Sequence, residues 1–183
     1  KMLEDNNVDV TALRRMNTSN GHAIIEVDKY GENSIILFAG TNGLIDEKYI
    51  DSVFEQVQGD EIVLFQNEIS SIAYAMKKAH QAGCKIAFNP APMNEKVLEY
   101  PLELVNILVV NLTEGKMLSG ENEPDAILTS LNIKYPNAKI ILTLGANGSW
   151  YSYEDVKFHI HANKADKVVD TTAAGDTFIG YYL

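Results

Sequence analysis

The segment IVLFQNEISSIAYAMKKAHQAGCKIAF (residues 62–88) is the clearest indicator of fold class in the chain. It begins and ends with short apolar runs, at residues 62–65 and 86–88. Between these runs, apolar side chains recur at helical spacing, at Ile69, Ile72, Ala73, Met76 and Ala79. Short apolar runs separated by a helix are typical of a buried parallel sheet, in which the helix is the crossover between two strands. The segment therefore predicts a strand–helix–strand unit.

The same alternation continues on both sides of this unit. Upstream, Asp46 is a candidate N-cap for a helix whose apolar positions are Ile50, Val53, Phe54 and Val57. Downstream, apolar runs at residues 107–110 and 140–142 lie on either side of a helical pattern near residues 126–133. We therefore predict an α/β fold, with a mostly parallel sheet, helices on both faces and right-handed crossovers.

Two further patterns predict β-hairpins. Residues 23–27 and 34–38 are β-rich runs on either side of a polar turn at residues 28–33. A lone hairpin is marginally stable in water, so this one must pack on another part of the protein or on a partner. Later in the chain, Asn147 and Gly148 separate two apolar runs and predict a tight hairpin turn.

The composition excludes several classes of function. The chain has 183 residues, of which 46% are hydrophobic and 22% charged, which indicates a folded domain with a sizeable core. A formal net charge of −10 argues against a nucleic-acid partner and against an anionic membrane surface. No apolar stretch approaches the length of a membrane span and no signal-peptide pattern is visible, so we expect a cytoplasmic protein. The single cysteine, Cys84, is expected to be a buried, inert thiol.

Residues 170–176, DTTAAGD, carry the most chemical information. A loop of small side chains here leads into a helix, whose N-terminal N–H groups and dipole favour an anion. The small residues 173–175 would let a phosphoryl group approach these amides, and Asp176 could accept a proton from an attacking hydroxyl. An ordinary helix start, with Asp170 or Asp176 as a favourable first-turn acid, fits the residues equally well.

The motif resembles the C-terminal signature of the PfkB carbohydrate kinases, in its ribokinase-like form. The resemblance implies ATP-dependent transfer of the γ-phosphoryl group to a hydroxyl of ribose or a related sugar, with Mg²⁺ and a monovalent cation such as K⁺. It implies that Asp176 is the catalytic base. It assigns the anion hole to Ala173, Ala174 and Gly175, and the monovalent-cation site to Asp170 and Thr172.

Two more segments match this family in the same order along the chain. Residues 111–114 resemble its Asn-x-x-Glu motif, which implies that Asn111 and Glu114 orient the hydrated magnesium ion and the phosphates. The same spacing is a helix capping box, and both roles can hold together. The turn that resembles the family's nucleotide-contacting segment consists of Thr143, Leu144, Gly145, Ala146, Asn147 and Gly148; a plain hairpin turn accounts for it equally well.

The sugar-binding residues rest on the resemblance alone. Glu68 matches the acidic residue that hydrogen-bonds the sugar, although a solvated surface glutamate would look the same. Residues 39–42 resemble the segment that leaves the family's lid, so the hairpin before it would be half of that lid, with Ala23 and Ile25 facing the sugar. Residues 89–92, Asn-Pro-Ala-Pro, recur in ribokinases and also suit a rigid turn.

The resemblance spans this chain but only the middle of a full-length family member, so we expect truncation at both ends. It divides the chain into a partial β lid at residues 1–43 and an α/β phosphoryl-transfer domain at residues 44–183. It also implies a homodimer formed through the lid. Because remote parts of a site help to position the reacting groups, we expect little turnover from these 183 residues alone.

Three hypotheses about function remain. The first is a sugar kinase, which the intact Gly175 and Asp176 favour. The second is a catalytically silent remnant that keeps a phosphate- or nucleotide-binding module or a dimer surface, which the truncation favours. The third is an α/β hydrolase or oxidoreductase, and it lacks support because the sequence contains neither a Gly-x-Ser-x-Gly elbow nor a Gly-x-Gly-x-x-Gly turn.

Overall fold

A computed structural model describes residues 1–27, 33–163 and 171–183. The chain forms two compact units. The first contains Lys1–Val57 and Glu68–Ser71, and the second contains Gln58–Asn67 and Ile72–Leu183. The expected boundary between lid and α/β domain, at residues 43 and 44, lies within the first unit.

The first unit contains a two-stranded hairpin and two short helices. Strands β1 (His22–Val27) and β2 (Asn33–Phe38) are antiparallel, and their register runs from His22↔Phe38 to Val27↔Asn33. This confirms the first predicted hairpin, while its turn at residues 28–32 lies outside the described residues. The other elements are helix α1 (Met2–Asp5), 3₁₀ helix η1 (Gly40–Leu44) and helix α2 (Glu47–Phe54).

Helix α2 begins where the sequence predicts and ends earlier. The Asp46 carboxylate accepts a hydrogen bond from the backbone N–H of Tyr49 at 2.8 Å, which is the expected N-cap. Ile50 is buried, as its position in the apolar pattern requires. The helix ends at Phe54, so Val57 lies beyond it.

The second unit is built on a six-stranded sheet in the order β3-β4-β5-β6-β7-β8. Neighbouring strands are parallel from β3 to β6, and β7 and β8 continue the sheet as an antiparallel hairpin. The strands are β3 (Ile62–Gln66), β4 (Lys85–Asn89), β5 (Ile107–Asn111), β6 (Lys139–Thr143), β7 (Ser149–Tyr153) and β8 (Val156–Ile160). The helices are α3 (Ile72–Gln81), α4 (Leu112–Ser119), α5 (Pro124–Lys134) and α6 (Ala174–Tyr182), with 3₁₀ turns η2 (Glu95–Glu99), η3 (Leu102–Leu104) and η4 (Gly145–Asn147).

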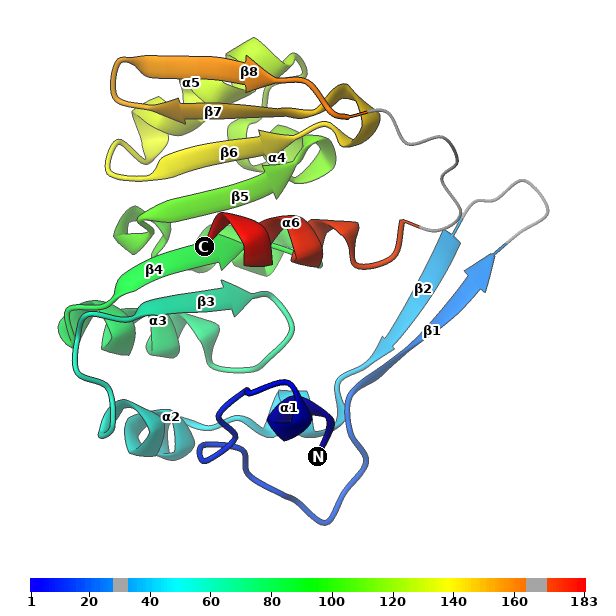
Figure 1. Cartoon of the computed structure of the whole chain (residues 1–183), viewed down its shortest axis with the longest axis vertical. Helices are drawn as coiled ribbons and strands as arrows, with labels where there is room; N and C mark the ends of the chain where they lie inside the picture. Colours follow the sequence, from blue (N-terminus) through cyan, green and yellow to red (C-terminus); the bar gives the residue numbers. More distant parts are fainter. Residues whose placement is uncertain (28–32, 164–170) are drawn as a thin grey trace. The chain divides into compact units, whose positions relative to one another are not determined.

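Helices cover both faces of this sheet, as the sequence predicts. Figure 1 shows α6 in front of the sheet and α3, α4 and α5 behind it. On the α6 face, Ile179 packs against a buried cluster of small and branched side chains from the strands: Ala87, Ile107, Val109 and Ile141. Strand residues of the opposite parity, including Phe88, Leu108 and Ile140, are also fully buried. Burial on both faces explains why these strands read as continuous apolar runs.

Two further sequence patterns can be placed in the structure, and the helix start near Ile69 is wrong in detail. Ile69 lies outside α3, which begins at Ile72. The preceding Ser71 has a φ of 60°, and its hydroxyl donates to the Ile45 carbonyl, so the backbone there follows loop contacts and not the helical pattern. The hairpin predicted at Asn147 and Gly148 is confirmed, because β6 and β7 are antiparallel and Thr143 pairs with Ser149 across a five-residue connection that contains η4.

The sequence also predicts a buried cysteine and no membrane span. Cys84 is buried, and burial raises the pKa of its thiol, as does the nearby Glu61 carboxylate, which suits an inert residue. Within the described part of the chain, no helix is long and apolar enough to cross a membrane.

Candidate active site

Four polar residues end the four parallel strands. Gln66 ends β3, Asn89 ends β4, Asn111 ends β5 and Thr143 ends β6. Gln66 and Asn89 are register partners, and so are Asn111 and Thr143. Because parallel strands all finish at the same edge, these side chains gather at the carboxyl edge of the sheet, where α/β proteins bind ligands.

Helix α6 begins at this same edge (Figure 1). Asp176 lies in its first turn, and its Oδ1 accepts a hydrogen bond from Gln66 Nε2 at 2.9 Å. The tertiary structure therefore brings the proposed base next to a strand end that is 110 residues away in sequence. The Asp176 side chain is exposed.

The small residues before Asp176 form the start of the helix. Ala173 is the N-cap, with a left-handed φ of 57°, and its carbonyl accepts from the N–H of Thr177. The N–H of Ala174 donates to the Thr171 carbonyl at 3.1 Å. A Cβ built on Gly175 would meet nothing within 4 Å, so the space beside this residue is open. Thr172 lies in the turn before the helix, while Asp170 lies outside the described residues.

Asn111 and Glu114 form the capping box that the sequence suggested. Asn111 Oδ1 accepts from the N–H of Glu114 at 2.9 Å, and Glu114 Oε2 accepts from the N–H of Asn111 at 2.8 Å. Glu114 is only 5% exposed, and burial raises the pKa of its carboxyl above the ordinary value of 4.5. The hydrogen bonds from Asn111 and Asn89 oppose this rise.

Residues 143–148 form a tight connection between β6 and β7. Thr143 Oγ1 donates to the Val110 carbonyl, and the N–H of Leu144 donates to the Gly148 carbonyl at 2.8 Å. Gly148 has a φ of 87°, and a Cβ there would collide with the Ile160 carbonyl oxygen, so the position requires glycine. The residues between, Gly145, Ala146 and Asn147, are exposed at the carboxyl edge.

The predicted sugar-binding residues belong to the first unit. Glu68 is exposed, and Ala23 pairs with Leu37 in the hairpin. Ile25 pairs with Ile35 through the backbone, and the side chain of Ile25 is not among the described parts of the chain.

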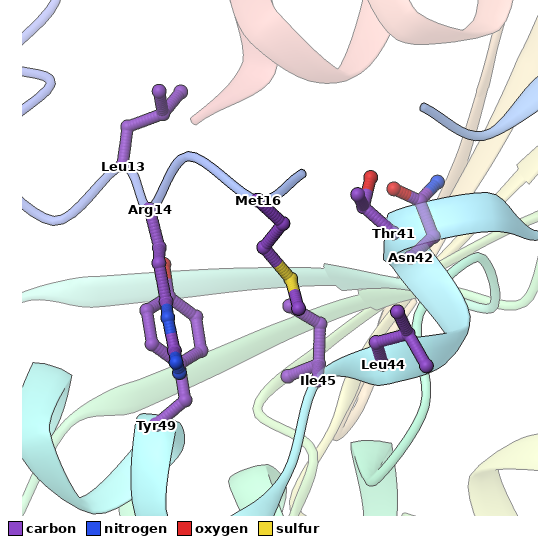
Figure 2. Close-up of a pocket in the computed structure, with 8 residues that line it drawn as sticks. All are labelled: Leu13, Arg14, Met16, Thr41, Asn42, Leu44, Ile45 and Tyr49. Carbon is purple, nitrogen blue, oxygen red and sulfur yellow. The ribbon is translucent and has the colours of Figure 1, made fainter. Parts of the chain in front are cut away.

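The first unit also contains a cavity of about 200 Å³ that sequence reasoning did not find (Figure 2). Thr41 and Asn42, from the segment that leaves the hairpin, form one side of it. Figure 2 shows Met16 reaching from the N-terminal segment toward Ile45. The remaining lining residues are Leu13, Arg14, Leu44 and Tyr49. Because these residues come from separate segments with no shared motif, no local pattern marks the cavity.

Two residues at the edge of the sheet have roles that the sequence did not reveal. Gln66 Nε2 donates to Asn89 Oδ1 at 3.0 Å as well as to Asp176. Asn89 Nδ2 donates to the Val109 carbonyl at 3.0 Å and lies 3.4 Å from Glu114 Oε2. In the sequence, each of these carboxamides comes directly after an apolar run. That pattern places the residue at the carboxyl edge of the sheet but does not indicate which side chains it contacts there.

The fold and the site together define an α/β protein with a candidate ligand site at the carboxyl edge of its sheet, beside a helix start that carries a carboxylate. The model for the pfkB family of carbohydrate kinases matches residues 1–183, and the chain belongs to that family.

Known relatives agree with this assignment. The chain is 35% identical over 204 residues to a ribokinase from Dictyostelium discoideum, covering 100% of this chain and 64% of the relative. It is 30% identical to a ribokinase from Schizosaccharomyces pombe, covering 98% of this chain and 59% of the relative. It therefore spans about three fifths of the length of these relatives.

Solved structures of similar proteins share the fold. A ribokinase from Cryptococcus neoformans in complex with ADP superimposes with a TM-score of 0.79 at 29% identity, over 99% of this chain and 63% of that one. A ribokinase from Arabidopsis thaliana complexed with ribose and ATP has a TM-score of 0.69 at 27% identity, over 89% of this chain and 55% of that one. These structures support the mostly parallel sheet with an added small hairpin.

Proposed function

We propose that the natural protein transfers the γ-phosphoryl group of ATP to a hydroxyl of ribose or a closely related sugar. The observation that carries the proposal is the placement of Asp176 in the first turn of α6, at the carboxyl edge of the sheet and beside the open space at Gly175. The relatives support the substrates, because they are ribokinases and one of the similar structures holds ribose and ATP.

In this proposal the chain supplies a base and an anion site. The Asp176 carboxylate takes the proton of the sugar hydroxyl as its oxygen attacks the γ-phosphorus, and the bond to the β–γ bridging oxygen breaks to release ADP. The N–H groups of Ala173, Ala174 and Gly175 stabilise the charge on the transferring phosphoryl oxygens. The Ala174 N–H would share this contact with the Thr171 carbonyl.

The proposed cofactors are ATP, Mg²⁺ and a monovalent cation. Among the described residues, no group of three or more His, Cys, Asp or Glu side chains gathers as a metal cage. Nucleotide sites commonly hold Mg²⁺ with one or two carboxylates, water and the phosphates themselves. Glu114 would act through water beside Asn111, the turn at residues 143–148 would contact the nucleotide, and Asp170 with Thr172 would hold K⁺.

The sugar and the assembly complete the proposal. Glu68 would accept hydrogen bonds from the sugar, and Ala23 and Ile25 would face it from the hairpin. Residues 1–43 would act as part of a lid, residues 44–183 as the phosphoryl-transfer domain, and two lids would pair in a cytoplasmic homodimer. The net charge of −10 opposes a nucleic-acid partner.

The test is Asp176→Asn in the full-length natural protein, with sugar-dependent ATP turnover as the measurement. Loss of a general base typically costs 10²- to 10⁴-fold, so we expect a drop in kcat of about that size with sugar affinity unchanged. Asp155→Asn, on the exposed turn between β7 and β8, is the matched control and should keep wild-type kcat. Near-wild-type turnover in Asp176→Asn would refute Asp176 as the base, and a wild-type protein that turns over no sugar would refute the kinase.

A further inference from the structure

Two carboxamides connect the proposed base to the interior of the sheet. Asn89 Nδ2 donates to the Val109 carbonyl, and Gln66 Nε2 donates both to Asn89 Oδ1 and to Asp176 Oδ1. The three donor–acceptor distances are 3.0, 3.0 and 2.9 Å. We call Gln66 and Asn89 the carboxamide bridge.

The direction of each bond in the bridge is fixed at its buried end. Asn89 is 8% exposed, and the Val109 carbonyl can only accept, so Asn89 must turn its NH₂ group toward it. Asn89 Oδ1 therefore faces Gln66 as an acceptor, and Gln66 must in turn present its own NH₂ group. The same NH₂ group reaches Asp176 Oδ1, so it can only donate to that carboxylate.

This arrangement matters for a carboxylate at the start of a helix. The Asp176 side chain is exposed, so without a fixed partner it could rotate between staggered conformers. The Gln66 donor selects the conformer in which Oδ1 points toward β3 and occupies that oxygen. The second oxygen, Oδ2, is then the one available for a substrate hydroxyl.

We propose that Gln66 is a positioning residue for phosphoryl transfer, holding Asp176 by Oδ1 while Asn89 holds Gln66. The proposal rests on the proposed function, because it gives Gln66 a purpose only if Asp176 is the base. Asn89 also lies 3.4 Å from Glu114 Oε2, so the bridge links the two carboxylates of the candidate site, one from α6 and one from α4.

Loss of the carboxamide bridge should change kcat, whereas loss of an ordinary structural contact should change only stability. A hydrogen bond that only joins α6 to the sheet would affect stability and leave the chemistry of folded molecules unaltered. A bond that orients the base affects the reacting geometry, and a displacement of about 1 Å in such a group can cost about 10²-fold in rate. The two roles therefore separate in kcat measured on folded protein.

The test is Gln66→Met in the full-length natural protein, which keeps the length of the side chain and removes its donor. We expect kcat to fall about 10- to 100-fold, with the KM values for sugar and ATP within about twofold of wild type. Gln81→Met, at the exposed end of α3, is the matched control and should leave kcat unchanged. If the Gln66→Met protein fails to fold, Gln66→Glu is the second variant. Its kcat should also fall, because the new carboxylate faces two hydrogen-bond acceptors, Asn89 Oδ1 and Asp176 Oδ1.

Combination with Asp176→Asn separates this inference from the proposed function. If Gln66 acts through the base, Gln66→Met should change the residual activity of Asp176→Asn by less than about twofold. An equal fall in both backgrounds would overturn the positioning role and leave the kinase intact. The positioning role would also be overturned if the wild type were active, Asp176→Asn inactive and the kcat of Gln66→Met equal to that of the wild type. No sugar-dependent turnover in the wild type would overturn both.

Discussion

Glu114 is a carboxyl group with two hydrogen-bond donors and almost no exposure to water. The Asn111 N–H and Asn89 Nδ2 both approach its Oε2. Burial is nevertheless the largest influence on its pKa and moves it upward, so the charged form is costly in the folded protein. A capping role does not require the charge, because the neutral Gln also serves at this position of a capping box.

Glu114→Gln should therefore stabilise the metal-free protein at neutral pH. The pKa of Glu114 is higher in the folded than in the unfolded chain, so wild-type stability falls as pH rises from about 4.5 through the folded value. The gain in Tm from Glu114→Gln should be present above that window and vanish below it. Thermal melts of both proteins across pH 4–8 measure the difference.

The exposed Glu121→Gln is the matched control for this variant and should leave Tm unchanged. In activity assays, Glu114→Gln should raise the magnesium concentration needed for half-maximal turnover, since the proposed role acts through hydrated Mg²⁺. An unchanged magnesium requirement would leave Glu114 with the capping role alone.

At the scale of elements, the start of α6 combines a left-handed N-cap residue with the residues of the proposed anion hole. Ala173 has a left-handed φ of 57°, a conformation that costs an L-residue about 1–2 kcal/mol. The turn it makes ends the preceding loop and starts the helix, with Ala174 and Gly175 as its first residues. Gly175 is thus a helical glycine, with open space beside it.

Gly175→Ala should separate stability from activity. Alanine is favoured over glycine within helices by about 1 kcal/mol, so the variant should be as stable as wild type or more stable. The added methyl group projects where a phosphoryl group would approach the amides, so kcat/KM for ATP should fall at least about 10-fold, or about 1.4 kcal/mol. Thermal melts and steady-state kinetics of the full-length protein measure the two effects.

Gly180→Ala in the same helix is the matched control. A Cβ at Gly180 also meets nothing within 4 Å, but this residue lies near the far end of α6. It should gain similar stability and keep full activity. If Gly175→Ala kept full activity as well, the helix start would not be the anion site.

At the scale of the whole molecule, the hairpin presents several exposed apolar side chains among the described residues. Ile24 and Ile36 are register partners, 58% and 62% exposed, and Phe38 is 52% exposed. Two strands alone are marginally stable, and clustered exposed apolar side chains commonly mark an interface. These features support the proposed lid-to-lid dimer.

Ile36→Asp should convert the full-length protein from dimer to monomer, because it would place a charge in the apolar interface. Sedimentation velocity over a concentration series measures the change. Ile133→Asp is the matched control, since Ile133 on α5 is 77% exposed and lies outside the hairpin. A wild type that sediments as a monomer at every concentration would contradict the proposed dimer.

Several parts of the fold could be predicted from local sequence because local physics determines them. The strands β4 to β6 are short, mostly apolar runs because both faces of the sheet are covered there. The caps at Asp46 and Asn111 involve residues three positions apart, within reach of a sequence pattern. The PfkB motif at residues 170–176 likewise lies on consecutive residues.

Other features depended on contacts between residues far apart in sequence, which no local pattern encodes. Helix α3 begins at Ile72 and not near Ile69, because the Ser71 hydroxyl is bound to Ile45 from a distant loop. The connection between β6 and β7 has five residues because the strand register, not the Asn-Gly pair, sets its length. The hydrogen bond from Gln66 to Asp176 forms only because parallel strand ends and the start of α6 meet at one edge of the sheet. The sequence by itself therefore determined the fold class, the family and the proposed base, while the tertiary structure alone decided which side chains surround that base.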